Sequence, residues 1–275
     1  RLKYGRLVHF TNHAADIDRE KRPDNIPIYE GKFFTSFDGC YAGFNHVAFE
    51  ERYKAKAHAC KLSPAEKKQY CPESRFFIKL KKWKTLSSTY NAEYMLAWHS
   101  LTSATNSQSC VATILPFIPA SQSVQFLIAE SHEELAYLCC LFGSVVFDYI
   151  VKNKLTGIDL TQSFIKQVVV PNMDSVKKCI IAYNGSKLSA YSLLLAICKQ
   201  LLHDDKRLKD FLPDISRKKI SLPNERRHLL MLMDALTATL YRISSDDFKY
   251  IFKFFSGYTS DEIEQMQAEI KHFVD

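Results

Sequence analysis

The sequence predicts an α+β fold, in which a mixed sheet comes first and a group of helices follows. Short apolar runs bounded by polar residues or proline dominate as far as Pro171, whereas apolar residues recur at helical spacing after it. The chain has 275 residues, of which 47% are hydrophobic, and this is enough to bury a sizeable core. We therefore expect an α/β part over residues 1–172 and a C-terminal helical subdomain over residues 173–275.

Strands are expected in the first half of the chain, where short apolar runs alternate with polar stretches. In order, they lie within Ile28–Phe49, Arg75–Lys84, Glu93–Leu101, Cys110–Phe117 and Val124–Ile128. Residues 1–26 are expected to be irregular, because they are polar and mixed in character. Arg75–Lys84 alternates loosely between apolar and basic residues, so Lys79 and Lys81 would share one face of that strand.

Helices are expected where a capping residue precedes apolar residues spaced three or four apart. Ser63, followed by Pro64, starts a short helix, and Ser131 starts one that runs to about Asn153. Leu160–Val170 is expected to be a turn or short helix that ends extended, because proline follows it. The helices expected after Pro171 are Leu188–Leu202, Glu225–Tyr241, Ser244–Phe255 and Ser260–Phe273.

Charge, cysteine content and hydropathy narrow the class of protein only slightly. Lys and Arg number 37 against 30 Asp and Glu, and the resulting net charge of +7 permits nucleic-acid binding without establishing it. The eight cysteines include no Cys-x-x-Cys pair, which argues against a zinc ribbon or a redox motif. Most lie in apolar runs, which indicates buried thiols in a reducing cytosol. The longest apolar run, Leu135–Phe147, is too short to span a bilayer, so no membrane partner is expected. Because the chain starts at Arg1 without a methionine, we expect a fragment.

Four separated segments carry a resemblance to a known family. They are Pro27–Lys32 with Phe37–Asp38; Ala104–Asn106 running into Ile114–Pro116; Phe147–Tyr149 through Lys154, Gly157 and Leu160 to Pro171; and Arg226–Arg227 with Asp234–Leu236, Tyr241 and Asp247–Ile251. In this order and spacing, residues 25–255 resemble the C-terminal target-recognition region of type IIG-like restriction–modification adenine methyltransferases, a group that includes phage-defence methylases. The resemblance implies a specificity domain for double-stranded DNA. It also implies an N-terminal methyltransferase domain in the same polypeptide and a cytoplasmic location in a prokaryote.

The loops that carry methyltransferase chemistry are absent from this sequence. Its eight glycines include no Gly-x-Gly, the spacing that lets a backbone approach a nucleotide cofactor, and they form no P-loop. The Asn-Pro-Pro-aromatic motif of adenine methylases is also missing. We therefore expect no catalysis and no cofactor in this chain, with S-adenosylmethionine bound by the presumed catalytic domain.

Basic and neutral polar residues near the matched segments are the candidate DNA contacts. Cations meet phosphates without reading sequence, whereas short neutral polar side chains can reach base edges. The candidate phosphate contacts are Lys32, Lys79, Lys81, Lys82, Lys84, Lys152 and Lys154. The candidate base-reading residues are Asn106, Gln108, Asn153, Thr156, Thr161 and Gln162. Simpler interpretations stay open: a solvated edge strand protected by lysines around residues 79–84, and a helix stop at residues 152–157.

The chain departs from the family pattern in its arginines. The resemblance implies an arginine where His99 stands and another in the region of Gln108, and a basic pair where Gly39 and Cys40 follow Asp38. Guanidinium groups make bidentate contacts that these residues cannot reproduce. Another basic stretch, Arg207–Lys219 around Pro213, is expected to be a solvated loop.

A metal-dependent DNA nuclease is an alternative function. Asp24, Glu30 and Lys32 fit the loose Asp…Glu-x-Lys spacing of restriction nucleases, in which carboxylates hold Mg²⁺ and the lysine helps to activate water. This chemistry needs Glu30 and Lys32 on one strand and pointing the same way. A protein-interaction module that does not bind DNA is a third hypothesis.

Overall fold

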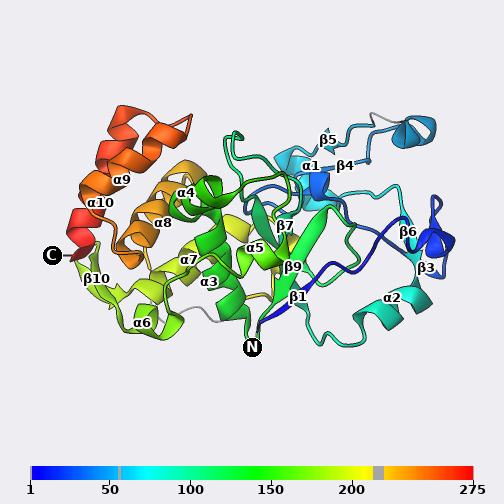
Figure 1. Cartoon of the computed structure of the whole chain (residues 1–275), viewed down its shortest axis with the longest axis horizontal. Coiled ribbons are helices and arrows are strands. Elements are labelled where there is room, and N and C mark those ends of the chain that lie inside the picture. Colours follow the sequence, from blue (N-terminus) through cyan, green and yellow to red (C-terminus); the bar gives the residue numbers. More distant parts are fainter. Residues whose placement is uncertain (1, 55–56, 213–219, 275) are drawn as a thin grey trace.

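The computed structural model describes residues 2–54, 57–212 and 220–274, and it confirms the α+β class (Figure 1). A central sheet lies in the middle of the molecule. The C-terminal helices lie at one end of the long axis and a small three-stranded sheet at the other (Figure 1).

The central sheet is antiparallel and has four strands. Its order is β1 (Lys3–Gly5), β9 (Val124–Ile128), β7 (Tyr94–His99) and β8 (Ala112–Pro116). The last three confirm the predicted strands. The first was missed, because three residues are too few to show an alternating pattern. A side chain at Gly5 would lie 2.2 Å from the ring of Phe126, so glycine is what lets β1 approach β9 here.

Both faces of this sheet are buried, by different parts of the chain. Leu96, Trp98 and Ile114 face the main core, which includes the long helices. On the opposite face, residues such as Met95 and Leu115 pack against aromatic side chains from the N-terminal region. Those aromatics are Tyr29, Phe33, Phe34 and Phe44. The alternation along each strand therefore divides the core into two layers.

The aromatic layer corrects the prediction of strands within Ile28–Phe49. This region is mostly irregular, apart from the 3₁₀ helix η2 (Gly31–Phe33) and the two-residue strand β4 (Ala42–Gly43), which pairs with β5 (Cys60–Lys61). Aromatic residues favour strands because they suit a half-buried surface. Here they are buried directly against the central sheet without joining it.

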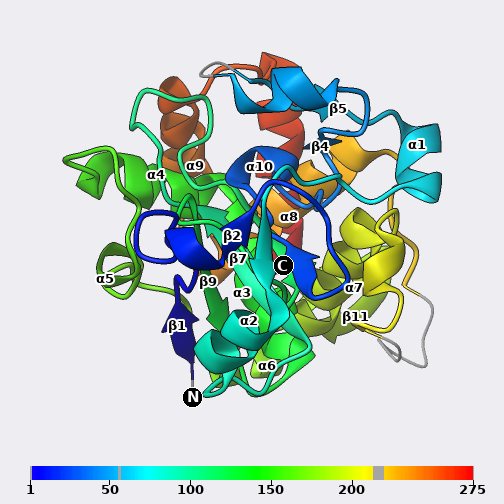
Figure 2. The same ribbon diagram turned by 90° about the vertical axis from the view of Figure 1, so that its right-hand side faces the viewer.

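The predicted strand Arg75–Lys84 is wrong beyond Lys79. Strand β6 (Phe77–Lys79) lies between β2 (Ile17–Asp18) and β3 (Asn25–Pro27), and helix α2 (Leu80–Ser87) follows directly. Trp83 and Leu86, three residues apart, turn to the core, so helical spacing decides the structure of this segment. Lys81, Lys82 and Lys84 therefore lie on a helix and do not form a row along a strand face. Seen from this end of the molecule, α2 lies in front of the central sheet (Figure 2).

Short helices and turns complete the N-terminal half. They are η1 (Ala14–Asp16), η3 (Phe49–Tyr53) and α1 (Pro64–Gln69). Ser63 caps α1 and forms a complete capping box with Glu66, which confirms the predicted helix start.

The predicted helix from Ser131 to Asn153 is two helices. Ser131 does cap the start, but α3 (His132–Gly143) and α4 (Val145–Lys154) meet at a bend of 64°. Ser144 between them is extended, and its hydroxyl accepts a hydrogen bond from the first turn of α4. Among the described residues, no single helix is long and apolar enough to cross a membrane, and only this bent pair together reaches such a length and composition.

The C-terminal part is mainly helical, as predicted, with one hairpin that was missed. Helix α5 (Gln162–Ile165) precedes this part, whose own helices are α6 (Met173–Lys178), α7 (Ala190–Leu202), η4 (Lys206–Leu208), α8 (Arg226–Leu240), α9 (Ser245–Ile251), η5 (Phe252–Phe254) and α10 (Ser260–Val274). Strands β10 (Ile180–Tyr183) and β11 (Ser186–Ser189) form the hairpin. Its turn, Asn184–Gly185, has positive φ at both residues, and Asn-Gly was the available sequence signal.

The main core is continuous across residue 172. It includes Trp98 of the central sheet and Leu141 of α3, together with Leu194, Leu236 and Phe273 of the C-terminal helices. The division into parts at residues 172 and 173 stays a prediction.

Candidate nucleic-acid interface

The structure joins the two sequence regions that hold the candidate base-reading residues. We call residues 100–109 and 153–162 together the loop pair. They are about fifty positions apart in the sequence, yet they form a short antiparallel ladder in which Leu101 lies opposite Asp159. The Thr102 N–H donates to the Ile158 carbonyl at 2.9 Å, and the Leu160 N–H donates to the Ser100 carbonyl at 2.7 Å.

Helix α4 fixes the first loop from beneath. The buried carboxylate of Asp148 accepts the Ser109 N–H at 2.9 Å and the Cys110 N–H at 2.6 Å. Burial raises the pKa of Asp148 in spite of these bonds. One turn further along, the Lys152 ammonium donates to the carbonyls of Ala104, at 3.2 Å, and Asn106. Asp148 was not predicted to have this role, although a lone carboxylate in an apolar helix was a signal in the sequence.

Three candidate base-reading residues present exposed side chains on the loop pair: Asn106, Asn153 and Thr156. The Asn106 amide makes one long contact, 3.4 Å to the Thr102 hydroxyl, and the Asn153 amide donates to the Tyr149 carbonyl at 2.8 Å. Thr156 has no side-chain hydrogen bond within the part of the chain that the structure describes. All three side chains therefore keep polar groups available to a ligand.

The side chains of the other three candidates, Gln108, Thr161 and Gln162, are half-buried. The Gln108 carbonyl oxygen accepts the Ser36 hydroxyl at 3.0 Å, and the Thr161 hydroxyl caps α5 by accepting the Phe164 N–H at 3.2 Å. Gln162, half-buried, lines an open cavity with Thr161 near β1.

The seven candidate phosphate contacts do not form one track. Lys152 and Lys154 belong to α4 beside the loop pair, whereas Lys79 to Lys84 belong to β6 and α2 at the end with the small sheet (Figure 1). Lys154 donates to the Gln167 carbonyl at 3.2 Å, so both lysines of α4 bind carbonyl groups.

The four lysines on and beside α2 differ in the contacts that their side chains make. Lys79 and Lys82 lie 3.8 Å and 3.5 Å from the carboxylate of Asp16. The side chains of Lys81 and Lys84 are exposed and have no ion pair or hydrogen bond with other described residues. Because they are three positions apart on α2, they share one face of the helix.

Glu30 and Lys32 do not have the geometry that the nuclease requires. Glu30 is buried, and Arg75 donates to both of its oxygens at 3.0 Å. Lys32 lies in the 3₁₀ helix η2, not on a strand, and contacts Glu30 at 3.5 Å and the Ala57 carbonyl at 3.4 Å. Asp24 is exposed. The nuclease alternative therefore rests on sequence spacing alone.

A cleft of about 240 Å³ next to the loop pair collects residues from, or directly beside, all four family-like segments. They are Ser36, Gln108, Asp148, Arg227 and Asp234. The four segments that carry the proposed resemblance are thus neighbours in space, although each lies in a different part of the fold. The cleft lies between the first loop of the pair and the start of α8.

Asp234 is the most perturbed carboxyl group in this cleft. It accepts the Val145 N–H at 2.9 Å and the Tyr258 hydroxyl at 3.3 Å, and complete burial raises its pKa to about 7. Arg227 stacks on the Tyr258 ring at 4.4 Å and donates to Glu262 at 2.7 Å and 2.8 Å. These contacts tie α8 to α4 and to the start of α10, which agrees with a bracing role for this segment.

His99 stands where the resemblance implies an arginine, and it packs inside the protein. His99 lies beneath Phe34, close to its carbonyl at 3.2 Å, and burial lowers the pKa of His99. The prediction that Arg207–Lys219 is a solvated loop is wrong at Arg207. This side chain is largely buried against Asp205 and the Gly39 carbonyl. Arg217, Lys218 and Lys219 lie outside the described residues.

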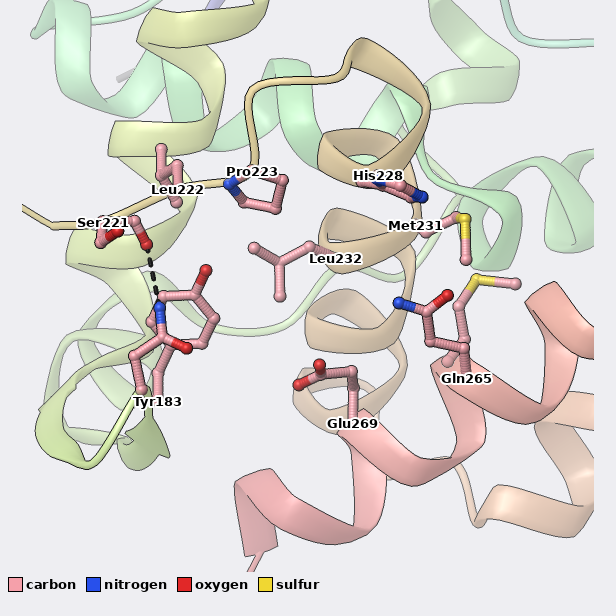
Figure 3. A pocket seen from close by; sticks show the side chains of 11 residues that line it. Tyr183, Ser221, Leu222, Pro223, His228, Met231, Leu232, Gln265 and Glu269 are labelled. Atoms are coloured by element: carbon pink, nitrogen blue, oxygen red, sulfur yellow. Dashed lines mark hydrogen bonds between the residues drawn. The ribbon is translucent and has the colours of Figure 1, made fainter.

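A separate pocket of about 300 Å³ lies among α8, α10 and the β10–β11 hairpin (Figure 3). Its lining is mixed: Met231 and Leu232 of α8 are apolar, and the side chains of His228 and Glu269 stand at its edges. The Asn184 amide closes one side by donating to the Ser221 carbonyl at 3.1 Å. The pocket contains none of the residues that the sequence analysis singled out for DNA.

Comparisons of this chain with known proteins found no similar protein. No protein-family model matches the chain, and neither the curated proteins nor the solved structures contain a significant match. The functional interpretation therefore depends on the residues and on the geometry described above.

Proposed function

We propose that this chain recognises a sequence in duplex DNA, as the specificity domain of a restriction–modification or phage-defence adenine methyltransferase. The loop pair is the observation that carries the proposal. Two regions about fifty positions apart, which hold the residues chosen from the sequence for base reading, are joined by backbone hydrogen bonds.

The chemistry of the exposed side chains suits base edges. An asparagine can make two hydrogen bonds to adenine in the major groove, and a threonine can bond to either a donor or an acceptor. Asn106 and Asn153 supply two amides, and Thr156 supplies a hydroxyl. The loops are held by backbone hydrogen bonds and by Asp148, so these side chains are presented on a rigid base, as discrimination between similar bases requires.

The rest of the proposed enzyme follows from the family resemblance. An N-terminal methyltransferase domain of the same polypeptide would bind S-adenosylmethionine and carry out the methyl transfer, in the cytoplasm of a prokaryote. The present chain would set the register on the duplex, so that the target adenine is flipped into the catalytic domain. It would itself hold no cofactor and perform no catalysis.

Selection of bound duplexes from a randomised pool, at two salt concentrations, tests the proposal directly. We expect enrichment of a defined sequence, and we expect Thr156→Ala together with Asn106→Ala to change that sequence. Thr89→Ala provides a matched control, because Thr89 is also exposed but lies after α2, outside the loop pair. Failure to enrich any sequence would contradict sequence-specific recognition. Salt-independent binding or no binding would favour the interaction module, and Mg²⁺-dependent nicking that Glu30→Gln abolishes would favour the nuclease.

A further inference from the structure

The pocket among α8, α10 and the β10–β11 hairpin has the size of a small-ligand site. Its volume of about 300 Å³ is at the lower end of the range for such sites, and it equals the volume of about ten water molecules in the liquid. Met231 and Leu232 of α8 and Met266 of α10 form its apolar part, and all three side chains are buried. Helix α10 packs against both α8 and β10, so the fold itself holds the walls in place.

Polar side chains of α10 stand beside this apolar part. Glu269 and Gln265 are four positions apart, so they share one face of the helix, and Figure 3 shows both on the pocket side. The ring of Tyr183, from β10, lies across the pocket from α10 (Figure 3). Burial raises the pKa of Tyr183, and the charge of Glu269 raises it further, so the carboxylate lies within electrostatic reach of the phenol.

The Glu269 carboxylate has no cation as its partner. It is half-buried, and it makes no ion pair or hydrogen bond with another residue in the part of the chain that the structure describes. The imidazole of His228, at the pocket edge, lies 3.6 Å from the carboxylate of Glu225 instead. Glu262, which is also half-buried on α10, differs in this respect, because Arg227 donates to both of its oxygens. The pocket therefore carries a negative charge that no described side chain neutralises.

The chemistry of the lining favours a cation with an apolar body. Opposite charges attract more strongly at a partly buried site than in water, and the face of an aromatic ring also attracts an ammonium group. Methionine side chains adapt their shape to irregular apolar groups. The amide oxygen of Gln265 can accept a further hydrogen bond from an ammonium group. An anion would be repelled by Glu269, and a neutral ligand would leave the carboxylate unpaired.

We propose that this pocket binds a small organic amine, whose ammonium group pairs with Glu269 and whose apolar body packs against Met231 and Met266. The inference goes beyond the proposed function and does not depend on it. The pocket is lined by no residue of the loop pair, and its ligand would be recognised by charge and shape in the absence of DNA.

The test uses 2-phenylethylamine as the probe, with 2-phenylethanol and phenylacetate as neutral and anionic probes of similar size. The chain has five methionines, so labelling their methyl groups with ¹³C gives five resonances, which Met→Leu variants assign. We expect the amine to shift the resonances of Met231 and Met266 saturably and to leave those of Met95 and Met173 in place. The amine should bind at least about tenfold more tightly than either other probe, because only an ammonium group makes charge-assisted hydrogen bonds to the carboxylate.

Two glutamate variants of α10 locate the charge that selects the amine. Glu269→Gln keeps the size of the side chain and removes its charge, so it should lower the affinity for the amine about tenfold, to that of the alcohol. The affinity for the alcohol should stay unchanged. Glu264→Gln is the matched control, because Glu264 is exposed on the same helix and does not line the pocket. It should leave the affinity for the amine unchanged.

Several outcomes would overturn this inference. They are equal affinity for the three probes, shifts of all five methyl resonances alike, and no saturable shift of Met231 and Met266. An equal loss of affinity in both glutamate variants would also overturn it, since that result shows general attraction to an acidic helix. The comparison of probes uses the unaltered chain and so does not depend on the folding of a variant. No DNA is present, so the result is independent of whether the chain recognises a DNA sequence.

Discussion

The loop pair and helix α2 are two candidate DNA-contacting regions, and they are built in opposite ways. The loop pair carries neutral polar candidates from two regions that are distant in sequence; a ladder joins the regions, and Asp148 and Lys152 hold the first loop. Helix α2, with Lys79 directly before it, carries closely spaced lysines at another end of the molecule (Figure 1). Two of these lysines, Lys79 and Lys82, lie beside Asp16.

The difference shows that spacing in sequence is a poor guide to a binding surface. Four lysines within six positions suggest a track, but a helix distributes them around its axis and a nearby carboxylate attracts two of them. Residues 106 and 156 give no joint signal in the sequence, yet buried hydrogen bonds place their loops side by side. Four predictions test this contrast, from the largest expected effect to the smallest.

The largest effect is expected at Asp234, which holds the start of α4 and so supports the helix beneath the loop pair. Its pKa of about 7 in the folded chain lies above its ordinary value of 3.8, so the folded state binds a proton more tightly than the unfolded state. Stability should therefore fall as pH rises from about 4 to 7, by at most about 4 kcal/mol. Urea unfolding across this range should show the fall in the unaltered chain and a flatter profile in Asp234→Asn. If stability changed with pH in the same way in the unaltered chain and in Asp234→Asn, the raised pKa of Asp234 would be contradicted.

The next effect is expected at Asp148, the anchor of the first loop. Replacing it with alanine leaves the Ser109 and Cys110 N–H groups buried without an acceptor, which should cost about 3 kcal/mol in the free energy of unfolding. The control is Asp210→Ala, because Asp210 is exposed beside Lys209 and such surface pairs contribute little. Chemical denaturation measures both variants. An equal, small loss in the two would show that the loop is held by other contacts.

A smaller effect is expected in DNA binding when Asn106 becomes alanine. The loss of an amide that contacts a base should cost about 1–3 kcal/mol on the preferred sequence and little on unrelated duplexes. Because base-edge contacts release no counterions, the dependence of affinity on salt should stay unchanged. Fluorescence anisotropy titrations at several salt concentrations would show both results. An equal loss on all sequences would contradict base reading by Asn106.

The smallest effect is expected on α2. Lys81 and Lys84 are exposed on one helix face, so Lys81→Gln with Lys84→Gln should lower the slope of log affinity against log salt by about 0.9 for each phosphate group that a lysine no longer neutralises. The same change at Lys79 and Lys82, beside Asp16, should lower it less. Affinity for all duplexes should weaken alike. An unchanged slope in both double variants would show that α2 is a solvated surface away from the DNA.

Local signals in the sequence determined several elements of this protein. Ser63 and Ser131 each began a helix where predicted, because a side-chain cap satisfies backbone N–H groups within a few residues and needs no distant partner. Strands β7, β8 and β9 were found because each is an apolar run of five or six residues, a length typical of strands, between polar or proline boundaries. The α+β class followed from these local patterns.

Tertiary structure alone decided the rest. The bend at Ser144 and the course of β1 beside Gly5 each depend on what packs against the segment, and short-range spacing does not contain that information. The candidate site shows the same limit. Its polar side chains were visible in the sequence, but their common surface exists because Asp148 and the Leu101–Asp159 ladder bring two distant loops together in the folded chain.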